Sequence, residues 1–394
     1  MLLCVLLGAL VRLAYLATHW GDKLLLNDSW YYSEQARQLA HGTFFREIFY
    51  DQPGAEHGPL TSILMAPVSY TSHYQDFQRV VTVVAGIALV WVIGRFAEEL
   101  AGPEVGLLAA FIAALYPNLW MNDGLVMSES ISMLLVALCM WAAWRAHQTA
   151  AVRGVAVGVA LGLAVLARSE LVLFAPLVLL WLAWTRRRQA LIAASCAALV
   201  VLPWVGFNLL RFEKPVVLTT NDGTTLLGAN CPQTYSGKHL GGWLVTCVAD
   251  DPAFDPAEEP SIRSARERSM GVHFALDHAE RLPIVAAARL GRSLDLFAIE
   301  DTIFQDLGEG RPKFFSWLGV VLFWGLAVGS VFGARFLDAR RRVLLLISVA
   351  TVLTTTVLFY GAHRIRSSAE PSLVILAAVA LVHWSRPAKR VDPS

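Results

Sequence analysis

Long apolar blocks alternate with polar stretches along the whole chain. Most of the blocks are roughly 16–22 residues long, which is the length that an α-helix needs to cross a hydrocarbon core about 30 Å thick. We therefore predict an all-α polytopic membrane protein with about ten transmembrane helices. The blocks lie at residues 2–18, 78–97, 104–120, 125–144, 152–167, 170–184, 189–209, 315–335, 342–360 and 371–385.

Two of these blocks, 152–167 and 170–184, are short for full spans, and they favour a tilted or partly re-entrant hairpin. Gly154, Gly158 and Gly162 recur at every fourth position of the first one. On a helix this spacing places a smooth strip on one face, which lets another helix approach closely. We interpret the strip as a structural feature.

Two polar stretches, residues 19–77 and 211–314, are too long to be simple connections. Basic residues near helix ends favour the inner side of a membrane, and they fall there throughout the chain if 19–77 lies outside. The same alternation places 211–314 outside as well. We therefore predict one transmembrane domain over residues 1–394 with two outer loops. The inner basic residues are Arg95, Arg145, Arg153, Arg186, Arg187, Arg188, Arg335, Arg340, Arg341, Arg342, Arg386, Lys389 and Arg390.

The composition agrees with a membrane protein. Hydrophobic residues make up 56% of the chain and charged residues only 16%, whereas about 25% of a soluble domain is charged. The net charge of +1 points to no particular class of partner. We predict membrane lipids as neighbours and no nucleic-acid partner.

Two short turns carry basic residues on the predicted outer side, where the rule disfavours them. One contains Arg168 and Glu170, and the other runs over 363–366, with Glu370 close behind. One interpretation is a salt bridge, either from Arg168 to Glu170 or from Arg366 to Glu370. The other is a bound anion, since ionisable residues at membrane depth are functional candidates. The residues alone leave both open.

The first outer loop, 19–77, predicts a helix that ends at Gly42, a natural C-terminal stop. Tyr32 and Ala36 fall on its apolar side, so we expect it to lie in the plane of the membrane interface. Asp28, at its start, suits a helix cap or a general base that takes a proton from an acceptor hydroxyl. His57, further along, suits a ligand, a proton carrier or a solvated loop residue.

The second outer loop, 211–314, holds two of the five cysteines, Cys231 and Cys247. Outer compartments are often oxidising, and a disulfide closing a loop of this size stabilises a fold by about 3 kcal/mol in the entropy model. We predict a disulfide between them, and no zinc site, because only His239 lies nearby. An amphipathic piece over 284–297 is predicted to lie on the membrane, with its arginines directed toward headgroups.

Several motifs in sequence order carry a resemblance to a known superfamily. The chain is similar to the GT-C membrane glycosyltransferases, in particular the protein O-mannosyltransferase-like and aminoarabinose-transferase-like group (glycosyltransferase family 39 and its bacterial relatives). The motifs are Asp28-Ser29-Trp30-Tyr31-Tyr32 with Gly42, Gly58-Pro59-Leu60, Ser128-Glu129, Pro203-Trp204 with Asn208 and Arg211, Thr220-Asn221-Asp222-Gly223, Gly228-Ala229-Asn230, and Tyr360 through Arg364, Arg366, Glu370 and Pro371.

This resemblance implies an inverting glycosyltransferase of the plasma membrane that acts on its extracytoplasmic face. The donor would be a polyprenyl-phosphate-linked sugar, and the acceptor a protein, lipid or envelope polysaccharide. Asp28 matches the catalytic base of the family. Arginine forks suit phosphate oxygens, so Arg364 and Arg366, followed by Arg168, are expected to bind the donor phosphate. Tyr32, His57 and Glu129 are expected to bind substrate.

The chain departs from the family where relatives often have two consecutive acidic residues, because it has Asp28-Ser29. No metal ligand is therefore assigned and no cofactor is predicted, although participation of a divalent metal stays open. Three other functions remain as alternatives. They are a transporter or lipid-linked glycan flippase, a non-catalytic scaffold, and a ligase that joins whole lipid-linked glycans.

Overall fold

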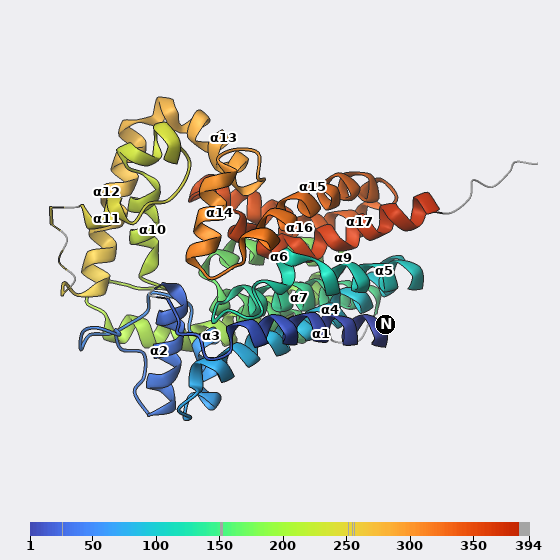
Figure 1. Ribbon diagram of the computed structural model, residues 1–394, viewed down its shortest axis with the longest axis horizontal. Helices are drawn as coiled ribbons and strands as arrows, with labels where there is room; N and C mark the ends of the chain where they lie inside the picture. The colour runs from blue at the N-terminus through green and yellow to red at the C-terminus, as the bar shows by residue number, and fades with distance from the viewer. Residues whose placement is uncertain (26, 150–152, 251, 254, 256, 386–394) are drawn as a thin grey trace, which may run out of the picture.

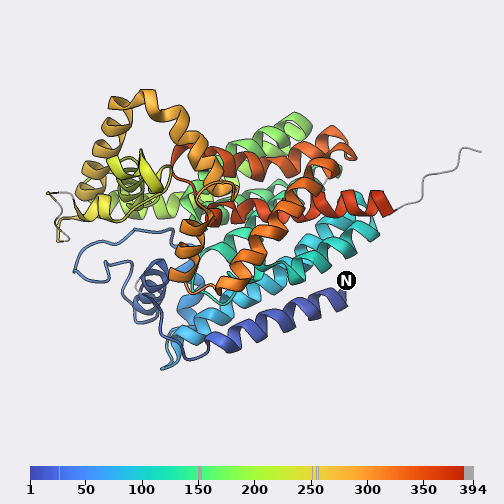
Figure 2. The same cartoon turned by 45° about the horizontal axis from the view of Figure 1, so that its top comes forward.

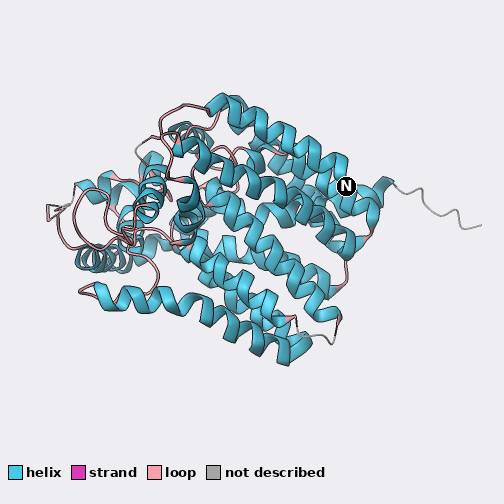
Figure 3. Ribbon diagram, turned by 90° about the horizontal axis from the view of Figure 1, so that it is seen from below, coloured by secondary structure: helices cyan, strands magenta, loops and turns pink. Residues whose placement is uncertain are grey.

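The computed structural model describes residues 1–25, 27–149, 153–250, 252–253, 255 and 257–385. Within this part of the chain all regular structure is helical, apart from an isolated bridge between Arg46 and Pro53 (Figure 3). The predicted all-α fold is therefore confirmed. The inner basic residues Arg386, Lys389 and Arg390 lie outside the described residues.

A bundle of long helices forms the body of the molecule (Figure 1). Seven helical segments of the described chain are long and apolar enough to cross a membrane, and α5 and α8 are apolar but shorter, so the count of ten spans is not confirmed. The bundle consists of α1 (Leu2–His19), α4 (Tyr74–Ala101), α5 (Pro103–Leu115), α7 (Glu129–Gln148), α8 (Gly154–Ala167), α9 (Phe174–Arg211), α15 (Lys313–Arg335), α16 (Ala339–Leu358) and α17 (Glu370–Ser385).

The difference in number has a local cause. The predicted blocks 170–184 and 189–209 both fall on α9, whose backbone departs from helical geometry at Arg186, with φ −152° and ψ 77°. The label α9 therefore covers two helices that are joined at Arg186, as the two separate blocks predict. The block 104–120 is divided between α5 and a short helix, α6 (Pro117–Trp120).

The glycine strip of α8 packs against the second half of α9. A Cβ atom on Gly158 would lie 2.3 Å from the Ala193 carbonyl oxygen, and one on Gly154 would lie 2.4 Å from that of Gln189. Real Cβ atoms do not approach carbonyl oxygens this closely, so only glycine permits the contact. The predicted structural role of the strip is confirmed.

The helices of the two polar loops gather at one end of the bundle, away from the N-terminus (Figures 1 and 2). The loops meet where the Thr220 amide donates to the Ala55 carbonyl at 2.8 Å. The first loop contributes α2 (Asp28–Ala40), α3 (Leu60–Met65) and a 3₁₀ turn, η1 (Ala66–Val68). The second contributes α10 (Asn221–Ala229), α11 (Thr246–Ala249), α12 (Pro260–Asp277), α13 (Leu282–Ser293) and α14 (Ile299–Gly308).

Predicted inner basic residues lie near the helix ends that are remote from these loops, and they contact groups of neighbouring helices there. Arg145 contacts Glu99 at 2.9 Å, and Arg186 donates to the His147 carbonyl at 3.1 Å. The two long loops and this basic set therefore occupy different parts of the bundle, as the charge distribution predicts. The chain is a multi-pass membrane protein.

Two arginines of α13 correct the expectation for residues 284–297. Arg289 and Arg292 are only 3% and 1% exposed, so they do not face headgroups. Arg289 donates to the Val357 carbonyl at 2.8 Å, and Arg292 pairs with Asp301 at 2.7 Å. Arg292 is satisfied inside the second loop, whereas Arg289 reaches α16, and an unpaired polar group at either position would be costly. Arg289 thereby fastens this loop to the end of α16.

An ion pair inside the bundle joins α1 to the segment before α7. Arg12 and Asp123 are both 0% exposed and lie 2.6 Å apart. Removing one partner leaves the other charge buried without compensation, which costs about 3–5 kcal/mol. We expect Arg12→Leu to lower the thermal unfolding temperature of the detergent-purified protein markedly. The double variant Arg12→Leu/Asp123→Leu should recover most of the loss, and equal melting of Arg12→Leu and wild type would contradict this account.

Candidate active site

A cavity of about 380 Å³ lies where the two long polar loops meet the end of the bundle. It gathers side chains that are far apart in sequence, and it includes five of the predicted site residues, which come from the first loop and from both misplaced basic turns. Its charged and polar lining includes Asp28, Tyr32, Glu56, His57, Ser128, Arg168, Glu170, Asp222, Arg268, Tyr360 and Arg364.

Asp28 is the first residue of α2 but not its cap. The cap is Asn27, whose side-chain oxygen accepts a hydrogen bond from the Ser29 amide at 2.9 Å. The capping interpretation of Asp28 is therefore wrong, because its neighbour already satisfies the free amide. The Asp28 carboxylate is 34% exposed and faces the cavity instead.

Two cationic side chains hold the Asp28 carboxylate. Arg364 lies 2.7 Å from one oxygen, and His57 Nε2 lies 3.6 Å from the other. Burial raises the pKa of Asp28, but the charges and hydrogen bonds of Arg364 and His57 outweigh it and hold that pKa well below its ordinary value. Asp28 is consequently ionised at neutral pH.

The His57 side chain is packed against other residues, which excludes its interpretation as a solvated loop residue. Its side chain is only 11% exposed, and its ring stacks on Tyr32 with ring centres 4.9 Å apart. Burial lowers the pKa of His57, but the carboxylates of Asp28 and Glu56 raise it by more. The imidazole therefore favours its charged form beside Asp28, and Tyr32 fixes the plane of the ring.

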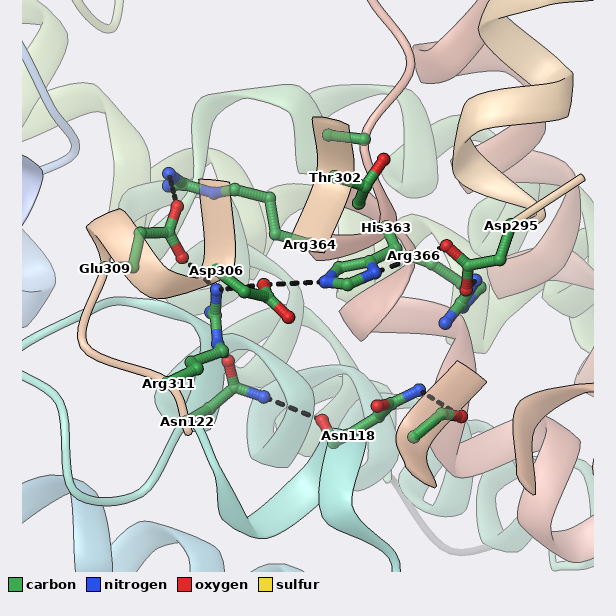
Figure 4. A network of polar contacts seen from close by, with 12 residues as sticks. Asn118, Asn122, Asp295, Thr302, Asp306, Glu309, Arg311, His363, Arg364 and Arg366 are labelled. Atoms are coloured by element: carbon green, nitrogen blue, oxygen red, sulfur yellow. Dashed lines mark hydrogen bonds and ion pairs between the residues drawn. The ribbon is translucent and has the colours of Figure 1, made fainter. Parts of the chain in front are cut away.

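Arg364 is the centre of the charged cluster. Besides Asp28, it contacts Glu309 at 2.7 Å, as Figure 4 shows, and Glu129 at 3.2 Å. Arg168 approaches Glu129 at 2.7 Å and also pairs with Glu170. The salt bridge considered for Arg168 is thus present, yet this residue lines the cavity as well. Two guanidinium groups therefore share one buried carboxylate next to Asp28.

Glu129 does not contact the cavity directly. It is 0% exposed and is not among the lining residues that the structure describes, although the preceding Ser128 is. The expected contact with substrate has no geometric support here, because the first turn of α7 points this side chain beneath the two arginines. Glu129 orients Arg168 and Arg364.

Arg366 lies away from the described lining of the cavity. It is 3% exposed and pairs with Glu370 at 2.6 Å. It also pairs with Asp295 at 2.8 Å, and Figure 4 shows these two residues side by side. Its guanidinium also lies 3.4 Å from the centre of the Phe323 ring. The salt-bridge interpretation of Arg366 is the one that the structure holds, and its predicted role in phosphate binding has no geometric support.

The sequence interpretation missed Glu309 and Arg311, which complete the cluster. Arg311 pairs with Glu309, contacts Asp306 at 3.0 Å and donates to Asn122 at 2.9 Å (Figure 4). A signal was available, because three charged residues within six positions directly precede the apolar block at 315–335. Charges so close to a membrane helix need partners.

One wall of the cavity is apolar. It includes Leu173 and Val216, together with Val172, Val217 and Leu358, which are 48%, 59% and 51% exposed. The wall therefore continues onto the outer surface of the bundle. It places an apolar path beside the charged cluster.

The remaining predicted site features lie in the second loop. Cys231 and Cys247 are joined by a disulfide in the structure. Among the residues that the structure describes, no group of three or more His, Cys, Asp and Glu side chains is arranged to hold a metal ion.

Residues 56–208 match the family model of dolichyl-phosphate-mannose-protein mannosyltransferase. No curated protein matched the chain in sequence. This matched segment contains His57, Glu129 and Arg168, whereas Asp28 and Arg364 lie outside it.

Solved structures of membrane enzymes resemble the chain over nearly its full length. The Archaeoglobus fulgidus oligosaccharyltransferase AglB, in complex with an inhibitory peptide and a dolichol-phosphate, has a TM-score of 0.57 at 14% identity and covers 97% of this chain. The same enzyme with Zn and sulfate has a TM-score of 0.58 at 15% identity and covers 96%. This chain spans about half of AglB, 50% and 49% in the two structures.

ArnT from Cupriavidus metallidurans, bound to undecaprenyl phosphate, has a TM-score of 0.47 at 15% identity, with 94% of this chain and 77% of ArnT covered. The AglB structures establish the fold. The chain is therefore a multi-pass membrane protein with the GT-C glycosyltransferase fold, and residues 56–208 match the dolichyl-phosphate-mannose-protein mannosyltransferase family.

Proposed function

We propose that the protein is an inverting glycosyltransferase that moves a sugar from a polyprenyl-phosphate donor to an acceptor hydroxyl. The observation that carries this proposal is the cavity in which the Asp28 carboxylate lies beside Arg364 and Arg168, next to an apolar wall. A base, phosphate-binding cations and a path for a lipid chain are the three parts that this reaction requires.

The donor would lie across these parts. Guanidinium forks bind phosphate oxygens through charge-assisted hydrogen bonds, so Arg364 and Arg168 would hold the donor phosphate. The prenyl chain would follow Val172, Val217 and Leu358 toward the lipid. The AglB complex with a dolichol-phosphate supports a lipid phosphate as the ligand of this fold.

The reaction is then a single displacement. Asp28 takes the proton of the acceptor hydroxyl while the acceptor oxygen bonds to the anomeric carbon of the sugar. The bond from that carbon to the phosphate oxygen breaks on the opposite face, which inverts the configuration. Arg364 and Arg168 stabilise the negative charge that the leaving lipid phosphate gains. His57 orients the Asp28 carboxylate through its second oxygen.

The face of the membrane follows from the charge distribution. The cavity lies among the two outer loops, 19–77 and 211–314, remote from Arg145 and Arg186. With basic residues inside, the active site would lie on the extracytoplasmic face of the plasma membrane. Loop 19–77 would be the catalytic loop of a single domain, and the acceptor would be a protein, lipid or envelope polysaccharide.

Mass spectrometry of the envelope glycans of a deletion strain tests this function. We expect one glycan species to lose a sugar in the deletion strain and to regain it when the wild-type gene is restored. The polyprenyl-phosphate form of that sugar should accumulate in the deletion strain. The lost mass then identifies the sugar. Unchanged glycans would exclude the proposed transfer, and lipid-linked sugar retained on the inner leaflet would identify a flippase instead.

A further inference from the structure

His363 bridges two buried carboxylates at the edge of the candidate active site (Figure 4). Its Nε2 lies 2.7 Å from Asp306, on α14, and its Nδ1 lies 3.3 Å from Asp295, between α13 and α14. The Asp306 and Asp295 side chains are 2% and 0% exposed, and the imidazole is 11% exposed. The reaction proposed above makes no use of this histidine.

The geometry requires a doubly protonated ring. An ionised carboxylate only accepts hydrogen bonds, so a ring nitrogen that faces one must carry a proton. Both nitrogens of His363 face carboxylates, and each carboxylate also pairs with an arginine, Asp306 with Arg311 and Asp295 with Arg366. Burial raises the pKa of Asp306, but His363 and Arg311 lower it below its ordinary value, so the carboxylate is ionised.

The same helix end also holds the residue that follows His363 in the chain. Arg364 pairs with Glu309, one residue beyond the end of α14, and Arg311 joins Glu309 to Asp306. Two neighbouring residues of the 3₁₀ turn η6 (His363–Ala369) are thus fixed to one short segment, 306–311. The position of the Arg364 guanidinium relative to Asp28 depends on this attachment.

We propose that protonated His363 is a positioning residue, which fastens the turn carrying Arg364 to α14 and thereby sets the affinity of the cavity for a lipid phosphate. The inference rests on the proposed function, because it takes Arg364 to be the phosphate ligand. Loss of the proton removes one donor and the charge between Asp295 and Asp306. The turn then loses its anchor, and the affinity falls as the pH rises.

Binding of a lipid phosphate to the purified full-length protein in detergent tests the inference. The probes are undecaprenyl phosphate and dolichyl phosphate. Their binding is measured by native mass spectrometry from pH 6 to pH 9.5. We expect the wild-type affinity to fall with rising pH. His363→Gln should bind about 10-fold more weakly at pH 6, with little further dependence on pH. His363→Lys, which keeps a charge, should recover part of the affinity.

A matched control is His273→Gln. His273 is exposed on α12, where its ring contacts Ser269 of the same helix, so its replacement should change neither affinity nor pH dependence. If His363→Gln does not yield folded protein, Asp306→Asn removes the nearer carboxylate and should weaken binding in the same way.

The outcomes separate the inference from the proposed function. Wild type that binds neither lipid phosphate overturns the proposed donor and the inference with it. Wild type that binds, while His363→Gln binds equally well, overturns the inference alone. A lower unfolding temperature with unchanged affinity shows a merely structural histidine and also overturns it. A pH dependence that survives in His363→Gln belongs to another group, such as His57, and contradicts the proposed protonation effect.

Discussion

Replacement of Asp28 by asparagine is expected to abolish sugar transfer while leaving lipid-phosphate binding intact. The amide is nearly isosteric but cannot take a proton, and general base catalysis contributes about 10²–10⁴-fold to a rate. Binding should be equal or somewhat tighter, because Arg364 loses one of the three carboxylates that compete with a phosphate for it. A variant that merely misfolds would lose both properties.

The measurement compares envelope glycans of a deletion strain complemented with wild type or with Asp28→Asn at matched membrane levels. Binding of undecaprenyl phosphate to the two purified proteins gives the second readout. Asp51→Asn is the matched control, since Asp51 lies in the same loop with a side chain 96% exposed. If Asp28→Asn restores the glycan fully, Asp28 is not the base, and the transporter or scaffold interpretation gains ground.

The fold was largely predictable because hydropathy acts locally. Each apolar block lies on a helix of the bundle, and the glycine strip of α8 packs where its spacing indicates. The number of spans was not predictable in the same way. The non-helical backbone at Arg186 divides α9 into two helices, where two separate blocks are predicted. The helices α5 and α8, however, are shorter than a full span, and hydropathy does not determine the residue at which a helix ends.

The candidate site was predictable only where a residue stood out against its surroundings. Arg168 and Arg364 attracted attention as positive charges on the disfavoured side, and both line the cavity. Glu309 was missed because its importance comes from a contact with Arg364, which lies 55 positions further along the chain. Sequence shows which charges need partners but not which partners they find.

Two arginines in the same turn illustrate this limit. Arg364 and Arg366 are two positions apart, and nothing in the sequence distinguishes their roles. The turn directs Arg364 into the cavity, whereas Arg366 points into the bundle, over Phe323 and against Glu370. The choice depends on which side of a short 3₁₀ turn meets the buried carboxylates, and that is a property of the assembled fold.

The paired state of Arg364 has a consequence for the order of events. Its guanidinium contacts Asp28, Glu129 and Glu309, so a phosphate must compete with these carboxylates. Arg364 moving toward the phosphate would release Asp28 from its strongest partner and make the carboxylate more basic. Donor binding would thus prepare the base for the acceptor, which favours binding of the donor first.

Replacement of Arg364 by glutamine is accordingly expected to weaken binding of undecaprenyl phosphate by about 10–100-fold. A charge-assisted hydrogen bond contributes about 1.5–3 kcal/mol, which corresponds to this range. The variant should also unfold at a lower temperature, because three carboxylates lose a common partner. Arg364→Lys should bind with intermediate affinity, since an ammonium group keeps the charge but not the planar fork. Titration of the purified proteins by native mass spectrometry measures the affinities, and thermal unfolding of the same proteins measures the change in stability.

The loss of stability must be separated from the loss of a ligand contact. The double variant Arg364→Gln/Glu309→Gln also neutralises a carboxylate that loses Arg364 and keeps only Arg311 as its partner, so it should recover part of the unfolding temperature. Its affinity should stay as low as that of Arg364→Gln, because neither change restores a cation to the phosphate position. A double variant that regains both stability and affinity would show that Arg364 only holds the fold together. The phosphate would then have to be bound by Arg168, whose two carboxylate partners would remain in place.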